Sequence, residues 1–189
     1  MQIVLRGPNG VVLLGILICV VSLSMRAQEQ CEPQAVTVAQ RFIYAQFQGA
    51  SIGGTPEAFK EARTLVIEDG EPPASPIVFV AGYKIKQAAA MGKECCISIM
   101  YERLGTISPE SLKLKPAKYQ ETVHIWLARD PDTWKVHMDA KQYGISPHVG
   151  ADAIRNWLHL FLQPPIDAKT AKAKRLLKTI DKYQATAPH

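Results

Sequence analysis

Two short runs of alternating apolar and polar residues, joined by Asp130-Pro131-Asp132-Thr133, constrain the fold of this chain more than any other feature. The runs cover residues 121–129 and 134–140. Alternation with a period of two is typical of half-buried strands, and a break of turn-forming residues between two such runs predicts a β-hairpin. The sequence therefore predicts an antiparallel pair of strands here.

The apolar faces of this hairpin also predict its register. One strand places Val123, Ile125 and Leu127 on one face, and the other places Trp134, Val136 and Met138 on one face. The two rows meet only if Leu127 lies opposite Val136, because a slip of one residue would send one row to the wrong side of the sheet. The other face then pairs His124 with Asp139 and Trp126 with His137.

That second face carries the candidate metal ligands of the chain, His124, His137 and Asp139. Two imidazoles and a carboxylate on neighbouring strands are suitable ligands for a metal ion and suitable groups for acid–base chemistry. The alternative is that all three are solvated side chains on an exposed strand face.

The chain before the hairpin predicts two helices and several strands. Apolar residues recur at helical spacing over residues 35–50, and Thr55-Pro56-Glu57 is a helix start for a second helix that runs to about Val66. The proline-rich residues 69–76 predict a loop. We expect extended chain over residues 77–81, 83–87 and 94–104, a connection over 88–93, and a polar stretch over 105–118.

The chain after the hairpin predicts two more helices. Ser146-Pro147 is expected to open the first, which ends at Pro164-Pro165. Residues 166–184 form an amphipathic segment with leucines on one side and lysines on the other. Its cations Lys169, Lys172, Lys178 and Lys182 are candidates for a weak contact with an anionic membrane surface. The alternative is a terminal helix packed on the domain.

These elements predict an α+β domain in which N-terminal helices pack on a curved antiparallel sheet of four or five strands, with a C-terminal helical extension. Over residues 35–140 the order of elements, and the Trp134-Lys135-Val136 strand after a tight acidic turn, resemble the nuclear transport factor 2-like and cystatin-like cone folds. The resemblance implies an apolar pocket between helix and sheet, which some relatives use for isomerase or dehydratase chemistry. Candidates to line such a pocket are Tyr44, Tyr83, Tyr101 and Glu102.

The first 28 residues have the layout of a signal peptide. Arg6 precedes an apolar run of 13 residues from Val11 to Leu23, and small residues follow at Ser24 and Ala27. A helix that crosses a bilayer needs about 20 residues, so we expect cleavage rather than a permanent anchor. The expected organisation is a signal peptide (1–28), one domain (29–165) and a basic tail (166–189), in a protein exported to the periplasm or secreted.

Three cysteines remain after the expected cleavage, Cys31, Cys95 and Cys96. Disulfides persist in exported proteins, and neighbouring residues on a strand point to opposite faces, so Cys31 can pair with only one of the other two. Cys31 with Cys95 is the candidate pair. The alternative is three buried thiols.

The formal net charge of +5 belongs to the two ends of the chain, because residues 29–165 carry −1. We therefore expect no nucleic-acid groove. Phosphate loops, serine elbows, zinc-protease motifs and CxxC pairs are absent from the sequence, and no cofactor is expected.

The expected function is non-enzymatic binding of a small apolar ligand or a protein partner, including a second copy through a sheet face. The alternatives are a small-molecule lyase or isomerase and a metal site on the hairpin.

Overall fold

The structure is a computed structural model that describes residues 30–67, 76–137, 146–164 and 167–185. The predicted signal segment and Asp139 lie outside these ranges. In order, the elements are α1 (Pro33–Phe47), η1 (Ala50–Ile52), α2 (Pro56–Thr64), β1 (Ile77–Met91), β2 (Glu94–Ser108), β3 (Lys113–Asp130), β4 (Thr133–Val136), β5 (His148–Val149), α3 (Ala151–His159), η2 (Leu160–Leu162) and α4 (Ala168–Ala185). The predicted α+β class is confirmed.

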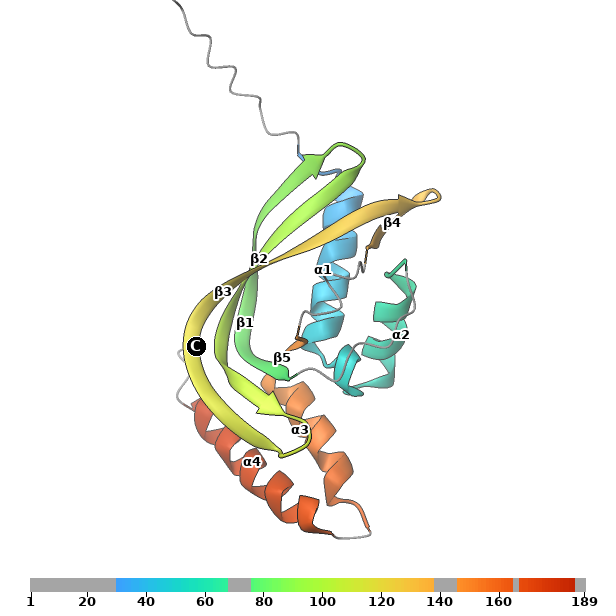
Figure 1. Cartoon of the computed structure of the whole chain (residues 1–189). Helices are drawn as coiled ribbons and strands as arrows, with labels where there is room; N and C mark the ends of the chain where they lie inside the picture. The colour runs from blue at the N-terminus through green and yellow to red at the C-terminus, as the bar shows by residue number, and fades with distance from the viewer. Residues whose placement is uncertain (1–29, 68–75, 138–145, 165–166, 186–189) are drawn as a thin grey trace, which may run out of the picture.

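The strands form one strongly curved sheet in the order β4-β3-β2-β1-β5 (Figure 1). The pairs from β1 to β4 are antiparallel, as expected. The sheet as a whole is mixed, because β5 runs parallel to β1 and pairs His148 with Val78. The expectation that Ser146-Pro147 opens a helix was therefore wrong: these residues lead into β5, and α3 begins only at Ala151.

The first three strands are longer than the sequence indicated. Strand β1 continues to Met91 and turns into β2 over Gly92-Lys93, where Gly92 has a positive φ of 68° that favours glycine. The polar stretch over residues 105–118 consists of the end of β2 and the start of β3, joined over residues 109–112. Most side chains of β3 before residue 121 are exposed, so this part lacks the buried apolar alternation that identifies a strand.

The hairpin register agrees with the prediction where the structure describes it. Leu127 lies opposite Val136, and the His137 amide donates a hydrogen bond to the Trp126 carbonyl over 2.8 Å. The turn is limited to the two residues Pro131-Asp132, because Thr133 already pairs with Asp130. On its free edge, β4 is covered by the segment that follows α2: the Val136 amide donates to the Leu65 carbonyl over 2.7 Å.

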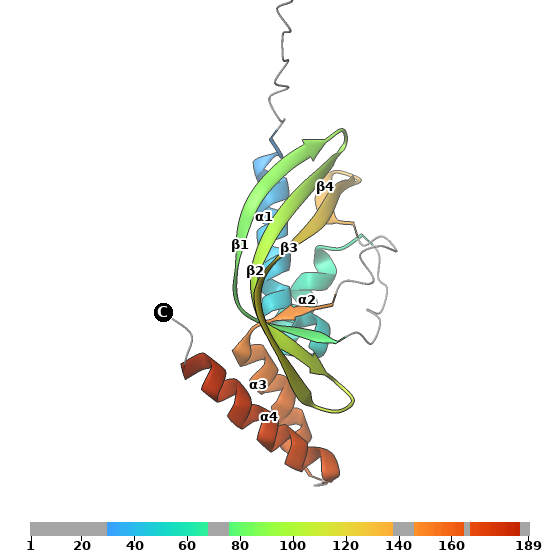
Figure 2. The same ribbon diagram turned by 60° about the vertical axis from the view of Figure 1, so that its left-hand side comes forward.

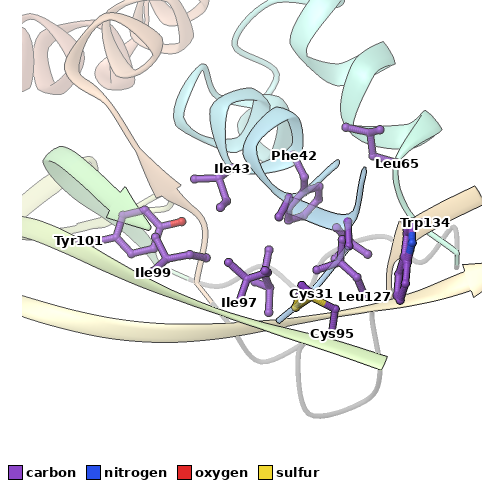
Figure 3. Close-up of a cluster of buried hydrophobic side chains, with 14 of the residues drawn as sticks. Cys31, Phe42, Ile43, Leu65, Cys95, Ile97, Ile99, Tyr101, Leu127 and Trp134 are labelled. Atoms are coloured by element: carbon purple, nitrogen blue, oxygen red, sulfur yellow. A yellow bond between two sulfur atoms is a disulfide. The ribbon is translucent and has the colours of Figure 1, made fainter. Parts of the chain in front are cut away.

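Helix α1 lies against the concave face of the sheet and forms a first core with it (Figure 3). Proline stands in its first turn, where the missing N–H costs no helical hydrogen bond. Ala39, Phe42 and Ile43 of α1 are buried against alternate residues of β2 and β3, among them Ile97, Ile99, Ile125 and Leu127. We call the face of the sheet that carries these residues the inner face.

A second core lies on the opposite, outer face at the other end of the sheet, where α3 and α4 pack (Figure 2). Neighbouring residues of β1 divide between the cores: Val78 belongs to the first, whereas Phe79 belongs to the second. Helix α4 contributes Ala173, Leu176 and Ile180, all of them buried. The two cores therefore share one sheet.

Candidate functional site

Five side chains form a polar cluster on the inner face, beside the C-terminal end of α1. They are Tyr101, Arg103 and Thr106 of β2, Glu121 of β3 and His148 of β5, and we call them the inner polar cluster. Tyr101 lies directly opposite Glu121 in the register. Leu104 is skipped in the pairing of β2 with both neighbours, and this bulge leaves Arg103 and Thr106 on the same face.

Glu121 is the centre of the cluster. Its Oε2 accepts hydrogen bonds from Arg103 Nη1 over 3.1 Å and from His148 Nε2 over 3.2 Å. Arg103 Nη2 donates to the Thr106 hydroxyl, and the Tyr101 ring stacks on the His148 imidazole with centroids 4.0 Å apart. His148 is only 5% exposed, whereas the side chains of Arg103 and Glu121 are 16% and 29% exposed. The partly exposed Arg103–Glu121 ion pair is therefore the part of the cluster that solvent reaches.

Burial determines the protonation of this cluster. It lowers the pKa of His148, although the Glu121 carboxylate and the Ser146 backbone act in the opposite direction. It also raises the pKa of Tyr101 well above the usual value, with smaller contributions from Tyr83 and Glu121. His148 and Tyr101 are thus both neutral at pH 7. The cluster can fix the curvature of the sheet and orient a polar group, but its imidazole Nε2 already has a partner.

A shallow, open groove lies between α1 and β1. It is lined by Gln40, Arg41 and Tyr44 from the helix and by Tyr83 and Ile85 from the strand. Tyr83 lies 6.1 Å from Tyr101 between ring centroids, so an aromatic contact connects the groove with the inner polar cluster. Burial raises the pKa of Tyr83, with a smaller contribution from Tyr44. The groove therefore offers aromatic surface and the uncharged hydroxyl group of Tyr83.

The four residues expected to line a pocket divide between three places. Tyr44 and Tyr83 line the groove, and Tyr101 is buried in the first core and the inner polar cluster. Glu102 was assigned wrongly: it follows Tyr101 on the strand, points to the outer face and is exposed.

The hairpin residues on the outer face are only partly described. His124 lies opposite Ser98 of β2, and its Nδ1 is 2.9 Å from the Ser98 hydroxyl. The backbone of His137 pairs with Trp126, and Asp139 is outside the described residues. In the part of the chain that the structure describes, no three His, Cys, Asp or Glu side chains converge as metal ligands.

Cys31 and Cys95 form a disulfide with a Cα–Cα distance of 5.7 Å. The bond joins Cys31, two residues before the start of α1, to the inner face of β2, within the first core (Figure 3). Cys96 points to the outer face, where its thiol is half-buried and burial raises its pKa. The Cys96 Sγ lies 4.0 Å from His124 Nδ1.

No known family model, curated protein or solved structure matches this chain. Among the described residues, no helix is long and apolar enough to cross a membrane. Helix α4 uses its apolar stripe for the second core, so Leu176 and Ile180 are buried while Lys169, Lys172, Lys178 and Lys182 remain on its exposed side. The apolar side chains of α4 that a membrane contact would use are therefore already buried in the second core.

Two groups of interest are missing from the expectations drawn from the sequence. His148 stands in a stretch assigned to a helix start, and only the short parallel pairing of β5 with β1 brings it to Glu121. Cys96 and His124 are 28 residues apart and meet because β2 pairs with β3. The alternating pattern of each strand predicts which side chains share a face, but it does not predict which strands are neighbours.

Proposed function

We propose that this protein is a non-enzymatic protein-binding module and that its partner docks in the groove between α1 and β1. The observation that carries the proposal is the pair of tyrosines, Tyr44 and Tyr83, beside Arg41 in an open groove. Tyrosine and arginine are enriched at the energetic centres of protein interfaces. Tyr44 is 58% exposed, which leaves a large apolar surface for a partner to bury.

The shape of the groove favours a protein partner over a small molecule. Pockets for small ligands usually enclose most of the ligand, whereas this groove is shallow and open. The neighbouring edge of β1 is a poor template for an added strand, because its pairing with β2 skips Ala81 and Lys86. Bulges and lysines are features by which edge strands avoid pairing with other chains. A partner side chain that inserts between the tyrosines fits this surface better.

The disulfide supports export, since such bonds persist in oxidising compartments. We therefore propose that the module acts in the periplasm or outside the cell. The curved sheet with α1 on its concave face also supports the interpretation as a nuclear transport factor 2-like cone domain.

The test is site-specific photo-crosslinking in the producing cells. Tyr44 is replaced by p-benzoylphenylalanine, and the same replacement at Tyr119 serves as the matched control, since Tyr119 is 48% exposed and lies under Arg103 rather than in the groove. We expect a discrete protein adduct from position 44 that is absent from position 119 and weakened by Tyr83→Ala. An adduct that contains two copies of this chain would identify a homodimer. Equal adducts from both positions, or none, would contradict the proposal.

A small-molecule lyase or isomerase is the second candidate, favoured by the His148–Glu121 pair of the inner polar cluster. It requires a bound small molecule next to Arg103. Native mass spectrometry of protein purified without chelator or reductant would then show an added mass that Arg103→Met removes. Arg129→Met is the matched control, because Arg129 also pairs with a glutamate and lies over an aromatic ring, but at the far end of β3.

A further inference from the structure

The outer face of the sheet brings a thiol and an imidazole close to the separation that two ligands of one metal ion need. Cys96 of β2 and His124 of β3 lie diagonally across the pair of strands, and their Sγ and Nδ1 atoms are 4.0 Å apart. Both side chains reach solvent: the Cys96 side chain is half-buried, and His124 is exposed. The disulfide leaves Cys96 as the free thiol of the described residues.

This distance is close to what one metal ion requires. With bonds of about 2.3 Å to sulfur and about 2.0 Å to nitrogen, tetrahedral geometry separates the two ligand atoms by about 3.5 Å. A small rotation of either side chain closes the remaining gap, and neighbouring strands hold both Cβ atoms in place. Thiolate and imidazole together are the ligand types that zinc(II) prefers.

We propose that Cys96 and His124 bind a thiophilic divalent metal ion, with Zn²⁺ as the test ion and water in the remaining coordination positions. On binding, the Cys96 thiol releases its proton to solvent, and its thiolate and the lone pair of His124 Nδ1 each form one bond to the ion. The Ser98 hydroxyl, now 2.9 Å from Nδ1, gives up that interaction. The site differs from the hairpin set expected from the sequence, because its sulfur ligand comes from β2.

Competition for His124 Nδ1 predicts opposite effects of two substitutions on metal affinity. In the free protein the Ser98 hydroxyl and the metal compete for the same nitrogen, so Ser98→Ala removes a competitor rather than a ligand. Cys96→Ser removes the soft ligand itself. A purely structural role for this face predicts no difference in metal affinity between the two variants.

The experiment is a zinc titration of the untagged protein against a chromogenic chelator, without reductant. We expect one Zn²⁺ per chain, an affinity at least about tenfold weaker in Cys96→Ser and in His124→Gln, and an affinity equal or higher in Ser98→Ala. His159→Gln, on the exposed end of α3, is the matched control and should bind like the parent protein. Zn²⁺ should also slow alkylation of Cys96 in the parent protein, but not in His124→Gln.

Three results would overturn the proposal. The first is absence of zinc binding by the parent protein. The second is binding that Cys96→Ser leaves unchanged while His137→Gln weakens it, which would instead support the hairpin site of His124, His137 and Asp139. The third is a loss of affinity in Ser98→Ala as large as that in Cys96→Ser. Circular dichroism of each variant shows that the measured protein is folded, and His124→Gln tests the site at an exposed position.

Discussion

His148 is a buried imidazole on which burial and Glu121 act in opposite directions. Burial of the site favours the neutral form, whereas Glu121 favours the charged form. Burial is the largest influence, so the pKa of His148 in the folded protein lies below its ordinary value of 6.5. The Arg103 guanidinium acts in the same direction as burial and also neutralises Glu121.

We predict that acidification weakens the fold through His148. A histidine with a lowered pKa in the folded state is protonated first in the unfolded chain, so its contribution to stability is complete above about pH 6.5 and declines as the pH falls below that value. The free energy of unfolding, measured in urea, should therefore be smaller at pH 5.5 than at pH 7.5. His148→Phe, which keeps an aromatic ring against Tyr101, should flatten this dependence.

The exposed His159 provides the control for this measurement. His159→Phe should leave the pH dependence of the parent protein intact. Glu32 also has a lowered pKa, through its hydrogen bonds from Arg129 and Trp134, but its contribution is lost only below its ordinary pKa of 4.5. An unchanged slope between pH 7.5 and 5.5 in His148→Phe would contradict the assignment.

At the level of elements, the disulfide ties the start of α1 to β2 across 64 residues of sequence. Removing it with Cys31→Ser/Cys95→Ser should lower the free energy of unfolding by about 3–4 kcal/mol, because the unfolded chain regains the entropy of that loop. Urea denaturation measures the loss. Cys96→Ser, one residue away on the outer face, is the matched control and should leave the stability nearly unchanged.

Helices α1 and α3 meet at Gly150, where a side chain has no room. A Cβ atom there would lie 2.5 Å from Cζ of Phe47, the last residue of α1. Gly150→Ala should cost about 1–3 kcal/mol, since the Phe47 ring must move out of a packed site. Gly82→Ala is the control, because a Cβ at Gly82 meets nothing within 4 Å. Equal denaturation midpoints for the two variants would argue against this packing.

The sequence predicts an element well when the residues that determine it are near one another in the chain, and poorly when it depends on pairing with a distant segment. The hairpin register and the start of α2 are local: Leu127 does lie opposite Val136, and the Thr55 hydroxyl accepts a hydrogen bond from the Ala58 amide. Strand β5 has only two residues and exists because β1 offers it an edge, so no periodicity of its own predicts it. The inner polar cluster depends on that strand and was therefore missed.

At the level of the whole molecule, two cores share one sheet, and this determines how the protein unfolds. In β1, Val78 and Val80 belong to the first core while Ile77 and Phe79 belong to the second. Strand β1 cannot lose its packing on one face without weakening the other. Helix α4 is thus a structural part of the domain, although its exposed side carries most of the excess positive charge.

We predict a single cooperative unfolding transition for both cores. Trp134 is buried in the first core and Trp157 in the second, so variants that keep one of these two and replace the other together with Trp126 report each core separately by fluorescence. Their denaturation midpoints should coincide. Leu176→Ala in α4 should cost about 2–5 kcal/mol and shift both midpoints equally, although Leu176 contacts only the second core. A shift of the Trp157 midpoint alone would mean that α3 and α4 unfold as a separate unit, because the shared strand β1 would then fail to couple the two cores.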